Sequence, residues 1–241
     1  MAADTARIAA DLAPTGVLRA SINLGNPVLA QGTPEAPSGI TVDLAQEFAA
    51  RLGLPLDLVC FEAARESFQA IVDGRADLGF LAVEPAREAE IAFTEPYVLI
   101  EGVFAVPRDS SFATPADVDR DGVRIGVKEG SAYDLYLTRT LQHATLVRGA
   151  EGTTVFAEQG LDVAAGIRQP VTAFAERHDA NGTGLRVIDQ RFMEIRQAVG
   201  TTRSRKPETV EFLRSVVEEL KADGSVEESL RRSGQVATPA S

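Results

Sequence analysis

The chain has 241 residues, of which 44% are hydrophobic and 24% are charged, as expected for one large globular domain or two smaller ones. Its formal net charge of −11 would repel phosphate backbones and anionic lipids, so we expect neither nucleic-acid binding nor direct membrane insertion. An anionic ligand stays compatible with this charge, because one buried arginine outweighs a distant surface field.

Residues 1–12 lack the basic and apolar regions of a signal peptide, and no run approaches the roughly 18 apolar residues of a membrane span. We therefore expect a periplasmic or extracellular protein whose export signal was trimmed, or otherwise a cytoplasmic protein. Cys60 is the single cysteine, which excludes an intrachain disulfide and predicts a buried core thiol.

Strand-like and helical patterns alternate along the chain, which favours an α/β fold with largely parallel sheets. The pattern over 42–52 predicts a helix with Leu44, Phe48 and Leu52 on one stripe, ending at Gly53. The first part of the chain is also expected to contain strands at 17–24, 54–61 and 76–83 and a short helix over 67–73.

A second unit is expected to begin near Thr114, with Pro115 at the first position of a helical turn. Its predicted strands are 123–127, 144–147, 161–166, 185–188 and 197–200, and its predicted helices are 132–142, 153–158 and 171–177. Helices over 207–221 and 225–232 and a loose tail over 236–241 complete the expected elements.

Two strand-like passages, 102–106 and 195–200, are expected to cross between two units of about 100 residues each. This organisation predicts two lobes with a cleft between them. Clefts between domains are preferred sites for small ligands, and hinge closure around a ligand is a known switching mode.

Motifs spread over most of the chain carry a family resemblance. They read VLRASI at 17–22, GITVDLAQEFAARLG at 39–53, GRAD at 74–77, REAEIAFTEPY at 87–97, VRIGVKEGS at 123–131, GLD at 160–162 and LKADG at 220–224. In order and spacing they resemble the family 3 extracellular solute-binding proteins of ABC importers, the binders of polar amino acids.

The resemblance implies a periplasmic-binding-protein type II fold, with two lobes that each contain a sheet flanked by helices. The first lobe would be discontinuous, with residues 1–106 plus 200–241, and the second would be residues 107–199. The resemblance also implies a monomer that captures a small solute and presents it to an ABC permease.

Arg87 is the foremost candidate for ligand binding. It lies six residues before Phe93, where the resemblance implies an arginine that grips the ligand carboxylate. A planar guanidinium suits this role because it meets both carboxylate oxygens at once. The alternative is a surface arginine among charged neighbours.

Gly130 and Ser131 open a predicted helix directly after a strand, and Ala132 follows them. Free main-chain N–H groups at such a helix start attract anions. The resemblance implies that this turn holds the same carboxylate from the second lobe. The alternative is an ordinary serine cap.

The chain departs from the family pattern at two places. The stretch 78–83, which includes Phe80 and Ala82, is apolar where the family has hydroxyl side chains. The family aspartate that accepts a ligand ammonium aligns with Ile167, and Arg168 follows it. Since an unpaired buried ammonium is costly, these departures favour a carboxylate without an amine, such as a keto acid, an aromatic acid or a dicarboxylate.

Arg168 is expected to bind a second anionic group or to form a salt bridge, and Glu101 either pairs with it or accepts an amine. Asn23 and Asn26 are candidate donors or turn residues, and Phe80 lines the pocket or packs in the core. The full predicted ligand-binding set is Arg87, Ser131, Gly130, Ala132, Arg168, Asn23, Glu101, Phe80, Ala82, Tyr133 and Gln197, with Gln169 as a weaker candidate.

The resemblance implies the solute-binding component of an ABC importer, and the departures described above favour a small organic acid or atypical amino acid, captured by hinge closure. One alternative is an enzyme on the same fold, such as a cyclohexadienyl dehydratase-like lyase, with Glu101 as an acid whose pKa burial raises. Another is a ligand-sensing module with a separate signalling partner. His143 and His178 lack metal-site spacing and no cofactor motif is present, so we expect no metal, cofactor or catalytic residue.

Overall fold

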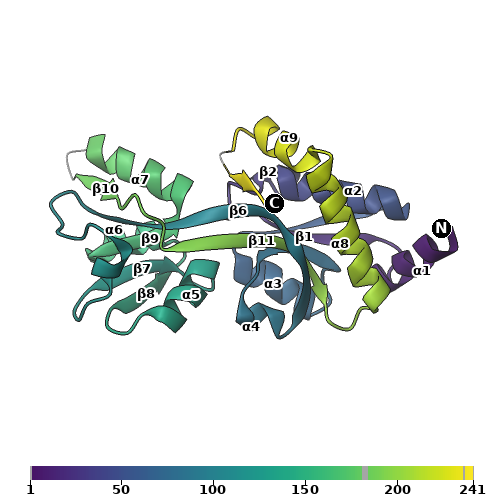
Figure 1. Ribbon diagram of the computed structural model, residues 1–241, viewed down its shortest axis with the longest axis horizontal. Coiled ribbons are helices and arrows are strands. Elements are labelled where there is room, and N and C mark those ends of the chain that lie inside the picture. Colours follow the sequence, from purple (N-terminus) through teal and green to yellow (C-terminus); the bar gives the residue numbers. More distant parts are fainter. Residues whose placement is uncertain (1, 181–183, 236, 241) are drawn as a thin grey trace. The chain divides into compact units, whose positions relative to one another are not determined.

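The computed structural model describes residues 2–180, 184–235 and 237–240 (Figure 1). The chain divides into two compact units, which are Met1–Leu99 with Arg196–Ser241 (unit 1) and Ile100–Ile195 (unit 2). It passes between them within strand β6 (Ile91–Pro107) and again within strand β11 (Met193–Thr202). Both units combine strands and helices, which confirms the predicted α/β class. Among the described residues, no helix is long and apolar enough to cross a membrane.

In unit 1, strand β1 (Leu18–Asn23) lies between two parallel neighbours, β4 (Leu56–Phe61) and β5 (Leu78–Ala82). Strand β11 runs antiparallel to β5, with Gln197 opposite Ala82. The three parallel strands all end at one edge of the sheet, so the residues that follow them lie along that edge.

Helices α2 (Ile40–Leu52), α3 (Ala64–Val72), α8 (Pro207–Ala222) and α9 (Ser225–Arg232) accompany this sheet, with the short α4 (Pro85–Glu88) and the hairpin β2 (Gln31–Thr33) to β3 (Ala36–Ser38) (Figure 1). Leu44, Phe48 and Leu52 are all buried, as the stripe predicted, and Gly53 ends α2 in the left-handed conformation. A core of α3 and β5 residues forms around Ile71, Leu81 and Phe93.

Helix α1 (Ala2–Leu12) was not among the predicted elements. Its last turn is fixed to the start of α8, where the Asp11 carboxylate accepts hydrogen bonds from the Lys206 main-chain N–H at 3.0 Å and from the Thr209 hydroxyl at 2.6 Å. Arg205 adds a hydrogen bond to the Asp11 carbonyl. These contacts join residues almost 200 positions apart, which no local pattern reveals.

The prediction of a loose tail over 236–241 is wrong for its described part. Strand β12 (Thr238–Pro239) pairs with β6 at Val98 and Leu99, and Ala240 N–H donates to the Tyr97 carbonyl at 3.1 Å. The tail is ordered because β6 offers main-chain groups that a further strand satisfies. Residues 236 and 241 lie outside the described residues.

In unit 2, strand β7 (Arg124–Lys128) lies between its parallel partners β8 (Thr145–Gly149) and β9 (Val163–Ile167). The C-terminal part of β6 is antiparallel to β9 and to β10 (Leu185–Val187). Helices α5 (Ala132–Thr140), α6 (Gly152–Gln159) and α7 (Arg168–Ala180) follow these strands, and a 3-10 turn spans Pro115–Val118. The core contains Phe156 and Phe174, whose rings meet edge to face.

Two predictions about single residues need correction. Cys60 is half-buried rather than a core thiol, because β4 is the outer strand of the unit 1 sheet. Helix α7 begins at Arg168 instead of 171, so Arg168 is the first residue of a helix and not part of the loop before it.

Candidate functional site

The carboxyl edge of unit 1 gathers several of the predicted site residues. Asn23 ends β1 and Ala82 ends β5, while Arg87 follows in α4 and Gln197 pairs with Ala82 in register. Gln197 and Ala82 are both buried and their side chains share one face of the sheet, because cross-strand partners in an antiparallel pair point the same way. This edge therefore brings together the Gln197 amide on β11 and the Arg87 guanidinium on α4.

Arg87 is buried, with only 3% of its surface exposed. Its Nη1 donates a hydrogen bond to the Ala82 carbonyl at 3.1 Å. Burial lowers the pKa of the Arg87 guanidinium to about 10, and the charge of nearby Glu84 offsets only part of this effect. The group is thus protonated at neutral pH in an environment that disfavours its charge. The expected alternative, a surface arginine, is excluded by its burial.

Asn23 and Asn26 both act as turn residues, which was one of the two roles expected for them. The Asn23 side-chain oxygen accepts from the Gly25 N–H at 3.0 Å, and that of Asn26 accepts from the Val28 N–H at 3.2 Å. Such contacts are the usual chemistry of asparagine in tight turns. Both residues therefore use their acceptor atoms to shape the loop after β1.

Phe80 packs in the core of unit 1. It is buried and meets the Tyr97 ring edge to face, with ring centroids 6.2 Å apart. Burial raises the pKa of the Tyr97 hydroxyl, which therefore stays protonated. Among the residues the structure describes, this hydroxyl has no hydrogen-bond partner. Sequence reasoning did not single out Tyr97, since its motif predicts only an aromatic residue at that place.

The first turn of α5 contains an acid, Asp134, that sequence reasoning missed. The Gly130 N–H donates to Asp134 Oδ2 at 2.9 Å, and the Asp134 N–H donates to the Ser131 hydroxyl at 3.1 Å. Asp134 is buried, and Arg148 Nε lies 3.0 and 3.1 Å from its two oxygens. A carboxylate of the chain itself thus occupies part of the predicted anion-binding turn. The spacing of Ser131 and Asp134, three residues apart, was the available signal.

Tyr133 and Ala132 lie in the first turn of α5 and are buried. Burial raises the pKa of the Tyr133 hydroxyl, the Glu151 charge adds to this, and hydrogen bonds with the Ser131 side chain and the Lys128 main chain oppose it. The Lys128 ammonium, also buried, forms an ion pair with Glu151. The carboxyl edge of unit 2 therefore contains a hydroxyl pair beside a paired lysine and glutamate.

Glu101 and Arg168 pair with each other. Arg168 Nε donates to the Glu101 carboxylate and its Nη2 donates to the Asp189 carbonyl at 2.6 Å. Arg191 Nη1 donates to the other Glu101 oxygen at 3.1 Å. Register explains the pairing, because Gly102 of β6 lies opposite Ile167 of β9.

The dehydratase alternative requires burial to raise the pKa of Glu101, and this condition is not met. Partial burial does oppose its ionisation, but the hydrogen bonds and charges of Arg168 and Arg191 outweigh burial and lower the pKa below its ordinary value. Glu101 is therefore an ionised partner of two arginines. It lacks the protonated form that a general acid needs at neutral pH.

Over the described parts of the chain, no group of three or more histidine, cysteine, aspartate or glutamate side chains is arranged to hold a metal ion. His143 is mostly exposed, and His178 packs against Phe174 within α7. Neither histidine lies at the carboxyl edge of its unit.

Comparisons with known proteins give sequence relatives among sensor proteins and structural relatives among solved binding proteins and sensor domains. The virulence sensor protein BvgS of Bordetella bronchiseptica is 34% identical over 115 residues, which is 47% of this chain and 9% of the sensor. BvgS of Bordetella pertussis is 32% identical over 130 residues, 53% of this chain and 10% of the sensor. The matched region is thus about a tenth of these much longer relatives.

Among solved structures, a mutant of the ArgBP protein from T. maritima superposes with a TM-score of 0.71 at 22% identity, covering 97% of this chain and 99% of that one. A histidine kinase sensor domain similar to periplasmic binding proteins gives 0.76 at 18% identity, with 93% and 98% covered. The ancestral amino-acid-binding protein AncCDT-1 gives 0.70 at 16% identity, with 91% and 96% covered.

These similarities confirm the predicted type II periplasmic-binding fold. The profile of one family, the bacterial extracellular solute-binding proteins, family 3, matches residues 23–234. That match covers most of the chain and bears out the resemblance seen in the sequence motifs. The chain belongs to the bacterial extracellular solute-binding proteins, family 3.

Proposed function

We propose that this chain captures a small solute through a carboxylate that binds Arg87. The observation that carries the proposal is the burial of Arg87 together with its pKa of about 10. A buried guanidinium that is still charged at neutral pH gains more from an anion than an exposed one does, because water screens the pair less. A carboxylate also matches the guanidinium geometry, with two parallel hydrogen bonds.

The solute that fits best lacks an amine. The position where the family has an ammonium-binding aspartate is Ile167, at the end of β9. The nearby acids of unit 2 already have cationic partners, since Glu101 pairs with Arg168 and Arg191 and Glu151 pairs with Lys128. A ligand ammonium would compete with these side chains or remain unpaired, at a cost of several kcal/mol.

This choice departs from the ligands named for several structural relatives, such as an ancestral arginine-binding protein bound to glutamine. Keto acids, aromatic acids and dicarboxylates remain the proposed classes. We further propose that the two units close around the solute and that the chain delivers it to an ABC permease. Its proposed location is the periplasm or the cell exterior.

A ligand panel with matched pairs tests the proposal. Pyruvate and alanine, 2-oxoglutarate and glutamate, and phenylpyruvate and phenylalanine differ mainly in whether the α-carbon bears an oxo group or an amine. At equal concentrations, the oxo acid of at least one pair should raise the melting temperature more than its amino acid, because stabilisation grows with ligand affinity. Greater or equal stabilisation by the amino acid in every pair that binds would reject the ligand class.

A sensor is the second candidate function, and the sequence match to BvgS favours it. The same ligand would then bias a signalling partner instead of loading an importer. Replacing the corresponding region of a BvgS-type sensor with this chain tests the idea. A kinase activity in the chimera that responds to the ligand, and that loses the response with Arg87→Met, would support the sensor. ATP hydrolysis stimulated in a reconstituted importer would instead support transport.

A further inference from the structure

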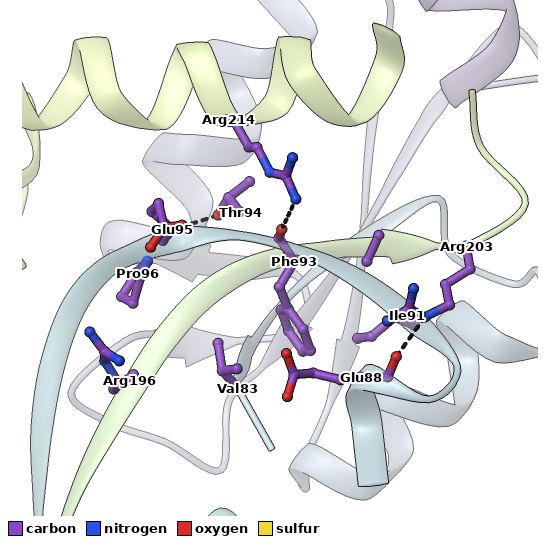
Figure 2. A pocket seen from close by; sticks show the side chains of 11 residues that line it. Val83, Glu88, Ile91, Phe93, Thr94, Glu95, Pro96, Arg196, Arg203 and Arg214 are labelled. Carbon is purple, nitrogen blue, oxygen red and sulfur yellow. Dashed lines mark hydrogen bonds between the residues drawn. The ribbon is translucent and has the colours of Figure 1, made fainter. Parts of the chain in front are cut away.

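Unit 1 contains a hollow whose lining does not include Arg87. It has a volume of about 300 Å³ and lies along the first residues of β6 (Figure 2). Three arginines line it, and each comes from a different place in the chain: Arg196 from β11, Arg203 from the segment between β11 and α8, and Arg214 from α8. Their convergence therefore depends on the tertiary fold and not on one basic run.

Two of the three guanidiniums are held by main-chain carbonyls. Arg203 Nε donates to the Glu88 carbonyl at 2.6 Å, and Arg214 Nη2 donates to the Phe93 carbonyl at 3.4 Å, as Figure 2 shows. A neutral carbonyl orients a guanidinium without neutralising it. Across the described residues, the Arg196 side chain has no hydrogen bond or ion pair. Arg196 and Arg203 thus have no carboxylate partner among these residues, and only Arg214 has one, at the long distance of 3.9 Å.

Two carboxylates, Glu88 and Glu95, line the same hollow. In the described part of the chain, neither lies within ion-pair distance of the three arginines, and the ion pair of Arg214 is with Glu211 on its own helix at 3.9 Å. The lining therefore has a net charge of +1 from three arginines and two glutamates, on a chain whose net charge is −11. Such a reversal of sign draws anions toward the hollow.

The exposed lining is mostly polar, because Ile91 and Phe93 contribute little surface. Guanidiniums on separate elements can each bind a carboxylate, which favours an acid with two carboxylates over one with a single carboxylate. The volume is at the lower end of the range for small-molecule sites, which favours a ligand of few atoms. We propose that this hollow binds a small organic acid with two carboxylates, at a site separate from that of Arg87.

Methyl NMR of the full chain carrying Arg87→Met tests the proposal, because Val83 and Ile91 line this hollow and the substitution removes the guanidinium of the other site. Titrating succinate at constant ionic strength should shift their methyl signals in a saturable manner. Butyrate, which has the same number of carbons and one carboxylate, should bind at least ~10-fold more weakly. Arg196→Ala and Arg203→Ala should each weaken succinate binding by at least ~10-fold, the usual scale for a lost charged hydrogen bond.

Glu88→Gln should increase the affinity for succinate, a result that loss of folded structure would not produce. Removing a negative charge from the lining should tighten succinate binding about threefold or more. Two exposed residues of unit 2 supply matched controls for overall charge, since Glu158→Gln and Arg177→Ala should leave the affinity unchanged. Shifts at Val83 and Ile91 that do not saturate below about 10 mM succinate would overturn the proposal. So would an affinity unaffected by Arg196→Ala and Arg203→Ala, or one that Glu88→Gln does not raise.

Discussion

Replacing Arg87 with methionine should stabilise the ligand-free protein while abolishing its stabilisation by ligand. Arg87 is buried, and its charged form is disfavoured there, as the pKa of about 10 indicates. Methionine has an unbranched apolar side chain that adapts to irregular space. The substitution therefore removes a buried charge without leaving a large void.

The magnitude follows from two contributions. Lowering the pKa of Arg87 to about 10, a value that already includes the attraction of Glu84, corresponds to about 3 kcal/mol of destabilisation of the charged form, at about 1.4 kcal/mol per tenfold change. Loss of the hydrogen bond to the Ala82 carbonyl costs about 1 kcal/mol. The net expectation is a gain of about 2 kcal/mol.

For a chain of this length, that gain raises the melting temperature by about 4–8 °C. Because the folded pKa of Arg87 lies far above neutrality, both folded and unfolded states are protonated at neutral pH, and the gain should not change until the pH approaches about 10. Urea and thermal unfolding of Arg87→Met, with and without a binding carboxylate, measure both effects. The matched control is Arg65→Met, an exposed arginine that should change stability by less than about 0.5 kcal/mol.

Destabilisation of the ligand-free protein by more than about 2 kcal/mol would refute this reasoning, because Arg87 would then be required for the fold itself. Undiminished stabilisation by the carboxylate in Arg87→Met would exclude Arg87 from the ligand site. A stable variant that has lost its ligand response is the expected result. It would identify the buried charge as a cost to folding that ligand binding relieves.

Three further predictions concern unit 2. Asp134→Asn should lower the free energy of unfolding by about 2–3 kcal/mol in urea titrations, because Arg148 loses its charged partner, whereas Asp121→Asn at an exposed position should have almost no effect. Glu101→Gln should cost less than about 1 kcal/mol at neutral pH, since the pair with Arg168 is partly screened by water. Because the folded pKa of Glu101 is lowered, its contribution is complete above the ordinary carboxyl pKa and disappears as the pH falls through the lowered value, so the two unfolding curves should converge in acid. Incubation with prephenate or arogenate should yield no product, because an ionised Glu101 is no general acid, and turnover that Glu101→Gln abolishes would restore the dehydratase alternative.

The sequence by itself determined the elements whose cause is local. The stripe of Leu44, Phe48 and Leu52 needs only the period of a helix, and Gly53 supplies the left-handed stop. Seven matched passages were enough to recognise the family, and that resemblance implied a ligand-binding role for Arg87, six residues before Phe93. These features depend on residues close together in the chain, where pattern and structure have the same cause.

Only the tertiary structure decided what each candidate side chain touches. Glu101 and Arg168 meet because β6 and β9 pair in a particular register, which makes each the charged partner of the other. Asp134 was missed in the sequence, and Arg148, which holds its carboxylate, is brought to it by the pairing of β7 with β8. The pKa of Arg87 depends on the burial of its guanidinium, and burial is a property of the packed chain that no spacing of residues contains.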